Sequence, residues 1–135
     1  MSQFELPRFL REFPITNAAN AAHVVDTVLS AKDRNSDSIL LLICDHDARP
    51  LQPVVISDVP WRTDRDSQER CFQFLSTFVD VKVLVALASG VELDVGTIRA
   101  WRESAEKELG DRMLFFMTAT PHKIQDHPAG VRSEP

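Results

Sequence analysis

Four apolar runs of strand length divide the chain, and polar or turn-forming residues bound each of them. They cover residues 39–44, 53–56, 81–87 and 113–118. Their apolar positions are nearly continuous rather than alternating, which is typical of strands that are covered on both faces. The first two runs flank the short polar segment 45–50, so they predict two antiparallel strands of a hairpin. The pattern therefore predicts a sheet with helices on both sides.

Three segments with helical spacing of their apolar residues are interspersed with these runs. Residues 17–29 place their apolar positions on one stripe after an asparagine that suits an N-cap. A second helix is predicted to start at Asp66 or Ser67. Its apolar face consists of Cys71, Phe72, Leu75, Phe78 and Val79. A third helix is predicted to start at Asp94 and to end at Gly110, which suits the C′ position.

The order of these elements predicts the fold class. A helix lies between each later pair of strands, and such connections favour βαβ units with parallel pairing. The sequence therefore predicts an α/β fold, a three-layer sandwich with a mixed sheet in which an antiparallel hairpin precedes βαβ units. A length of 135 residues suits one domain, which we assign to residues 17–120. Residues 121–135 lack a sustained apolar period and predict a flexible tail.

Residues 1–16 form a predicted amphipathic arm. Its apolar residues with helical spacing are Leu6, Phe9, Leu10 and Phe13. Pro7 suits the first turn of a helix and Pro14 stops it. A helix this short needs a groove that buries its apolar side, on its own domain, on a second copy or on another protein. We therefore predict these four residues, together with Trp61 in a polar loop, as a contact surface for a homodimer or a protein partner.

Composition and charge narrow the classes of function. With 44% hydrophobic and 26% charged residues, the chain is typical of a globular protein. A net charge of −5 argues against binding to nucleic acid. The N-terminal segment has charges among its apolar residues, so it predicts neither a signal peptide nor a membrane span. Cys44 and Cys71 lie in apolar segments without CxxC spacing, which predicts reduced, buried thiols and a cytoplasmic protein.

The segment Cys44-Asp45-His46-Asp47 is the densest set of possible metal ligands in the sequence. Two interpretations are open for Asp45, His46 and Asp47: a metal or acid–base site, or polar residues of a hairpin turn. A second polar group, composed of His122, Asp126 and His127, lies within the predicted tail. These residues can complete a zinc site with His46 only if the fold brings the two groups together.

Complete catalytic and cofactor motifs are absent from the sequence. The glycines are too far apart for a phosphate-binding loop, and their positions are Gly90, Gly96, Gly110 and Gly130. Cys71 lies on the apolar stripe of its helix rather than beside a histidine, so it is a weak candidate for a nucleophile. We therefore predict no cofactor and no catalytic residue.

Residues from about 38 to 120 resemble the JAB/MPN group of proteins, and within it the RadC-like proteins. The resemblance rests on the strand 81–87 that runs into Ala88-Ser89-Gly90, the helix 95–109 and the last strand 113–118. It implies a JAB-like order of elements, which a deaminase-like fold would share. It also implies a metal site with two histidines on the strand and an aspartate on the following helix.

Those ligand positions hold other residues in this sequence. Val85 to Ala88 stand where the histidines would lie, and Ile98 stands where the aspartate would lie. The resemblance thus implies a degenerate scaffold that serves as a non-catalytic interaction or assembly module. Two alternatives stay open. One is a metal-dependent hydrolase with an atypical site near Cys44 to Asp47. The other is a small-molecule-binding regulatory domain with a pocket near Asp45, Ser89 and Thr118.

Overall fold

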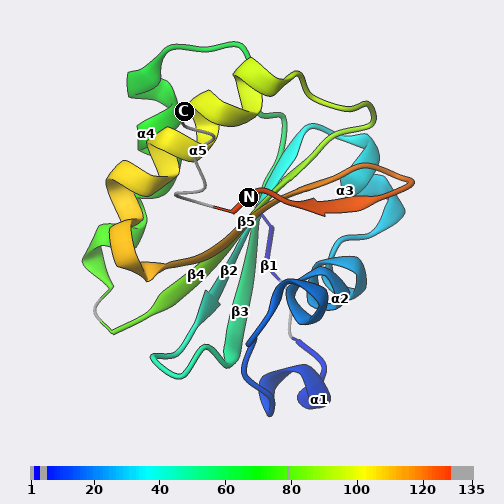
Figure 1. Ribbon diagram of the computed structural model, residues 1–135, viewed down its shortest axis with the longest axis vertical. Coiled ribbons are helices and arrows are strands. Elements are labelled where there is room, and N and C mark those ends of the chain that lie inside the picture. Colours follow the sequence, from blue (N-terminus) through cyan, green and yellow to red (C-terminus); the bar gives the residue numbers. More distant parts are fainter. Residues whose placement is uncertain (1, 4–5, 79, 129–135) are drawn as a thin grey trace, which may run out of the picture.

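The computed structural model describes residues 2–3, 6–78 and 80–128. Figure 1 shows a central sheet with helices on both of its sides. The elements in chain order are β1 (Ser2–Gln3), α1 (Arg8–Arg11), α2 (Ala18–Val28), α3 (Ala31–Asn35), β2 (Ser38–Cys44), β3 (Pro50–Ile56), α4 (Arg65–Gln73), the 3-10 helix η1 (Phe74–Thr77), β4 (Lys82–Ala88), α5 (Val95–Leu109), the 3-10 helix η2 (Gly110–Arg112), β5 (Met113–Ala119) and β6 (Ile124–Asp126). Among the described residues, no helix is both long and apolar enough to cross a membrane.

The sheet is mixed, with strand order β1-β3-β2-β4-β5-β6. Strand β2 pairs with β3 and with β4, in both cases antiparallel. Strands β4 and β5 are parallel and are joined through α5. The predicted antiparallel hairpin and the parallel βαβ unit are therefore both confirmed. Because β2 is antiparallel to both of its neighbours, β3 and β4 run in the same direction and α4 crosses between them.

Two apolar layers, one on each face of the sheet, form the core. All seven residues of β2 are buried, and its six apolar residues, 39–44, alternate between the two layers. Helices α1 and α2 cover one face, where Val24 and Val25 contact the layer that contains Leu40. Helices α4 and α5 cover the other face with Phe72 and Trp101. Figure 1 shows α2 on the side of the sheet opposite α4 and α5, so the predicted three-layer α/β sandwich is confirmed.

The predicted caps of two helices are confirmed. The Asn17 side chain accepts a hydrogen bond from the backbone N–H of Asn20 at 2.8 Å, at the start of α2. Asp94 accepts one from the N–H of Thr97 at 3.1 Å, at the start of α5. Gly110 ends α5 with a φ of 55°, a conformation that glycine adopts without a steric penalty.

The start of α4 differs from the prediction. Its N-cap is Asp64, which accepts a hydrogen bond from the backbone N–H of Ser67 at 2.8 Å, rather than Asp66 or Ser67. This backbone hydrogen bond, with that of the Ser67 side chain, lowers the pKa of Asp64. The α-helix ends at Gln73 and continues as η1, and Val79 lies outside the described residues.

Two elements have no counterpart in the sequence-based prediction. Helix α3 contains five residues and starts with a capping box, in which Ser30 and Asp33 bond to each other's backbone N–H groups. Strand β6 lies within the segment 121–135, for which the sequence predicted a flexible tail. It pairs antiparallel with β5, and Ile124 packs against the core. A strand of three residues is too short to show a periodic pattern. Its formation depends on the neighbouring strand with which it pairs.

The N-terminal arm packs on its own domain. Leu6 and Leu10 are buried in the core layer of α2, and β1 pairs with β3. Helix α1 is shorter than predicted, because Pro7 takes the N-cap position and the helix ends at Arg11. Phe9 and Phe13 face outward, with 54% and 64% of their surface exposed. The arm is therefore anchored by its two leucines and presents its two phenylalanines to solvent.

Candidate functional site

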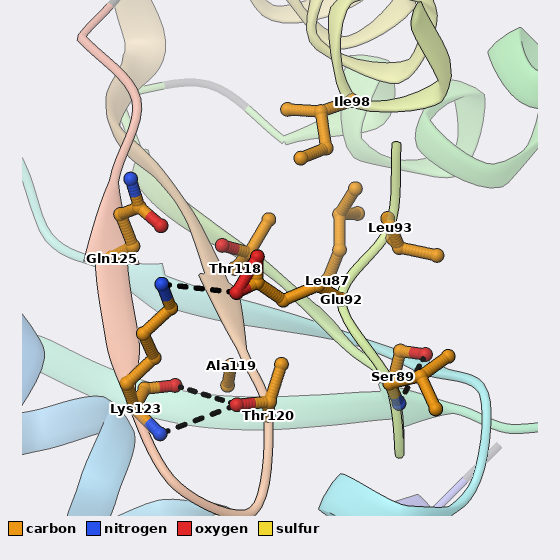
Figure 2. A pocket seen from close by; sticks show the side chains of 11 residues that line it. Leu87, Ser89, Glu92, Leu93, Ile98, Thr118, Ala119, Thr120, Lys123 and Gln125 are labelled. Carbon is orange, nitrogen blue, oxygen red and sulfur yellow. Dashed lines mark hydrogen bonds and ion pairs between the residues drawn. The ribbon is translucent and has the colours of Figure 1, made fainter. Parts of the chain in front are cut away.

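A small pocket opens at the carboxyl ends of the adjacent parallel strands β4 and β5 (Figure 2). Strands β4, β5 and β6, the start of α5 and the loop before it all contribute to its wall. Its volume is about 20 Å³, which is room for one or two water molecules. Open α/β sheets bind their ligands outside the carboxyl ends of parallel strands, so this position favours a binding site.

Hydrocarbon side chains line one part of the pocket. Leu87 comes from the end of β4, Leu93 from the loop that follows and Ile98 from the first turns of α5. Leu87 is fully buried, and the other two pack against the core layer beneath α5. This part of the pocket suits an apolar group, because contact with hydrocarbon removes apolar surface from water.

Polar side chains line the opposite part. Thr118 on β5 and Gln125 on β6 are paired in register across the two strands. Figure 2 shows both side chains on the same wall of the pocket. The Thr118 hydroxyl lies 2.9 Å from Nε2 of His127, which holds it in place. Ser89 accepts a hydrogen bond from the N–H of Val91 at 3.3 Å and shapes the loop above β4.

An ion pair spans the mouth of the pocket. Lys123 Nζ lies 3.0 Å from Glu92 Oε2, and 53% and 65% of the two side chains are exposed. Figure 2 shows the Glu92 side chain extending from the loop before α5 toward the Lys123 ammonium beside β6. The backbone of Lys123 is positioned by a tight turn, in which its N–H donates to the Thr120 hydroxyl. The site therefore combines a hydrocarbon surface with one positive and one negative group.

His127 is less basic than a histidine in water. Burial lowers its pKa from 6.5; nearby Asp126 opposes this effect, and Arg102 on α5 adds to it. The folded state therefore takes up a proton less readily than the unfolded state. The free energy of unfolding should fall as the pH drops below about 6.5, because protons then favour the unfolded chain.

Replacing His127 with asparagine should remove this part of the pH dependence. Urea unfolding at a series of pH values measures the slope, and the expected loss is a fraction of one bound proton. His46→Asn serves as the matched control, because 72% of the His46 side chain is exposed in a turn. An unchanged slope in His127→Asn, or the same change in His46→Asn, would contradict the assignment.

The segment Asp45-His46-Asp47 forms the hairpin turn between β2 and β3. Oδ1 of Asp45 accepts hydrogen bonds from the backbone N–H groups of Asp47 and Arg49, both at 2.9 Å. His46 lies 3.5 Å from Asp47 and is largely exposed. These contacts are those of an Asx turn, so they support the turn interpretation of this segment.

The grouping of Asp45 with Ser89 and Thr118 is wrong. Cys44, at the end of β2, pairs with Lys82 at the start of β4. Asp45 therefore lies at the end of the sheet opposite the pocket. The reason is the antiparallel pairing of β2 and β4, which sends the carboxyl ends of the two strands to opposite edges.

The second polar group lies far from the first. Asp126 and His127 follow β5 along its outer edge, and His122 precedes them in an exposed turn. His46 follows β2, which β4 and β5 separate from β6 in the sheet, so the fold does not bring it to these residues. Within ranges 2–3, 6–78 and 80–128, no three His, Cys, Asp or Glu side chains are grouped to hold a metal ion.

Burial disfavours the thiolate form of both cysteines. Burial, together with the charge of Asp45, raises the pKa of Cys44 to about 12, so its thiol stays protonated at neutral pH. Burial also raises the pKa of Cys71. Cys71 is half-buried rather than fully buried, and its thiol donates to the Ser67 carbonyl at 3.7 Å.

Trp61 contributes to the core beneath α5 and is only partly exposed. Its ring packs edge-on against Trp101, with 5.5 Å between the ring centroids. Its carbonyl accepts a hydrogen bond from Trp101 Nε1 at 2.9 Å. Trp61 is therefore not a free surface residue, although the sequence around it is polar. Of the five predicted contact residues, Phe9 and Phe13 are the most exposed.

Positions 85, 87 and 98 do not suit a metal. Val85 and Leu87 are fully buried, and Ile98 packs against the same core layer. Their hydrocarbon side chains supply none of the nitrogen, oxygen or sulfur ligands that zinc requires. These three positions therefore offer no ligand set for a metal ion.

The fold and the pocket together define a three-layer α/β protein with a mixed sheet and a small site beside its parallel strands. Comparison of the chain with protein-family models, curated proteins and solved structures gave no match. Sequence reasoning singled out Ser89 and Thr118 but missed Glu92, Lys123 and Gln125. The pattern carried no signal for these three, because they meet only when β6 pairs with β5.

Proposed function

We propose that the protein is a non-catalytic interaction module on a JAB-like scaffold, and that it forms a homodimer through its N-terminal arm. The observation that carries this proposal is the difference in burial between the leucines and the phenylalanines of the arm. Leu6 and Leu10 are buried, whereas Phe9 and Phe13 are more than half exposed. Exposed aromatic side chains on an anchored segment suit a contact surface, since aromatic residues, phenylalanine among them, are enriched in the cores of protein–protein interfaces.

The core positions of the scaffold support a role without catalysis. The resemblance places metal ligands at positions 85, 87 and 98, which hold Val85, Leu87 and Ile98. Their side chains pack with the α5 layer instead. A scaffold that has lost these ligands retains its surfaces, and surfaces are sufficient for an assembly role.

The charges of the arm favour a second copy of this chain as the partner. Arg8 and Glu12 form an ion pair at 3.5 Å and are exposed by 86% and 57%. A two-fold interface places each patch against its own copy, so charged residues around its apolar centre pair across the interface only if both signs are present. The arm meets this requirement, with Phe9 and Phe13 at the centre.

Sedimentation velocity over a range of protein concentrations tests the proposal. We expect the wild-type chain to dimerise and the double variant Phe9→Ser, Phe13→Ser to remain monomeric. The matched control is Val91→Ser, Val95→Ser, which removes two valines that are 73% and 72% exposed at the other end of the sheet. This control should dimerise as the wild type does.

Two results would overturn the proposal. One is a wild-type chain that stays monomeric at the highest concentration tested. The other is a dimer that persists in the Phe9→Ser, Phe13→Ser variant. Circular dichroism of each variant shows whether the fold is retained, so that a lost dimer is not confused with a lost fold.

A further inference from the structure

We propose that the pocket at the ends of β4 and β5 binds a free α-amino acid with a short aliphatic side chain. This inference is independent of the proposed homodimer, because the pocket lies at the carboxyl end of β4, whereas α1, with the exposed phenylalanines, lies near the β2–β3 turn at the opposite end of the sheet. It rests on three features of the pocket: the paired charges at its mouth, its hydrocarbon floor and its polar wall.

The charges at the mouth match the two charges of an amino acid. Glu92 and Lys123 face each other at 3.0 Å. An α-amino acid carries an ammonium and a carboxylate on one carbon atom, so it can bond to Glu92 and Lys123 at once. When the ligand replaces the direct contact between Glu92 and Lys123, both side chains keep a partner of opposite charge. This replacement costs little, because the two side chains are largely exposed and such ion pairs contribute little to stability.

The hydrocarbon floor provides for the side chain of the ligand. Leu87, Leu93 and Ile98 lie behind the ion pair, between β4 and α5. With the pair closed the pocket has a volume of about 20 Å³. The side chain of valine needs more room than this, so the proposal requires Glu92 and Lys123, which both line the pocket, to separate when the ligand binds. The small size of the floor favours a side chain such as that of valine over an aromatic one.

The polar wall adds a further contact. Gln125 and Thr118 stand side by side next to Lys123. The Gln125 amide offers two N–H donors, and the Lys123 ammonium lies on the same side of the pocket. A ligand carboxylate that binds Lys123 can therefore also accept a hydrogen bond from the Gln125 amide on β6.

Isothermal titration calorimetry with L-valine tests the proposal. Isobutylamine is valine without its carboxylate, isovalerate is valine without its ammonium, and glycine lacks the side chain. We expect L-valine to bind and each of these three probes to bind at least about tenfold more weakly, since charge-assisted hydrogen bonds and apolar burial are each lost. Isovalerate binding as tightly as L-valine would overturn the proposal, as would no heat from L-valine.

Variants of the ion pair make the test specific to this pocket. Glu92→Gln and Lys123→Met should each weaken L-valine binding at least about tenfold. Glu103→Gln is the matched control, because Glu103 pairs with Arg65 at the same distance of 3.0 Å but does not line the pocket. Unchanged binding in both pocket variants would overturn the proposal. Sedimentation of the same variants keeps this result separate from the oligomeric state.

Discussion

Replacing Trp101 with alanine should lower the free energy of unfolding by about 3–5 kcal/mol, the largest effect that we expect from a single substitution. Trp101 is fully buried in the layer between α5 and the sheet. Its ring packs edge-on against Trp61 and Phe72, with centroid distances of 5.5 and 6.3 Å. The alanine variant would leave a cavity and would also remove the hydrogen bond to the Trp61 carbonyl.

Urea denaturation followed by far-ultraviolet circular dichroism measures this loss. Trp101→Phe is the matched comparison, because it keeps an aromatic ring but removes the N–H donor. We expect its loss to be smaller than that of the alanine variant. A loss below about 1 kcal/mol in Trp101→Ala, the size of an average substitution, would contradict the packing of Trp101 in the core.

The second large effect is expected in the arm. Leu10→Ala should lower the free energy of unfolding by about 2–5 kcal/mol. The reason is that the leucine side chain is buried in the α2 layer, with an exposed fraction of 6%. Phe9→Ala should change the free energy of unfolding by no more than about 0.5 kcal/mol, because its ring is more than half exposed. Two neighbouring residues of one four-residue helix would thus differ severalfold in their effect.

This comparison needs dilute protein. Dimerisation stabilises the folded state by mass action, so a high concentration would add the dimer contribution of Phe9 to the measured value. Denaturation curves at several low concentrations separate the two contributions. Equal losses for Leu10→Ala and Phe9→Ala under these conditions would show that Leu10 does not anchor the arm.

The strands and long helices followed from local patterns. Continuous apolar runs predicted β2, β4 and β5 within one or two residues, because strands buried on both faces have few polar positions. Asn17 and Asp94 predicted the starts of α2 and α5, because an N-cap bonds to backbone three residues away. The start of α4 was predicted two or three residues late, at Asp66 or Ser67, because aspartate and serine at these positions suit an N-cap as well as Asp64 does.

Short and non-local features escaped prediction. Strand β6 depends on the edge of β5, and α3 depends on a capping box within five residues. The four apolar arm residues also differ in burial, although all four belong to one pattern of helical spacing. Burial of Leu6 and Leu10 is decided by the surface that α2 and the sheet offer them, which no local pattern contains.

By itself, the sequence determined the three-layer α/β class, the antiparallel hairpin and the parallel unit around α5, since periodicity and caps are properties of neighbouring residues. Only the tertiary structure decided which polar residues meet. The antiparallel pairing of β2 with β4 moved Asp45 away from Ser89, and the pairing of β6 with β5 brought Lys123 to Glu92. Strand direction and register are set by contacts between distant segments, so the pocket became visible only in the folded chain.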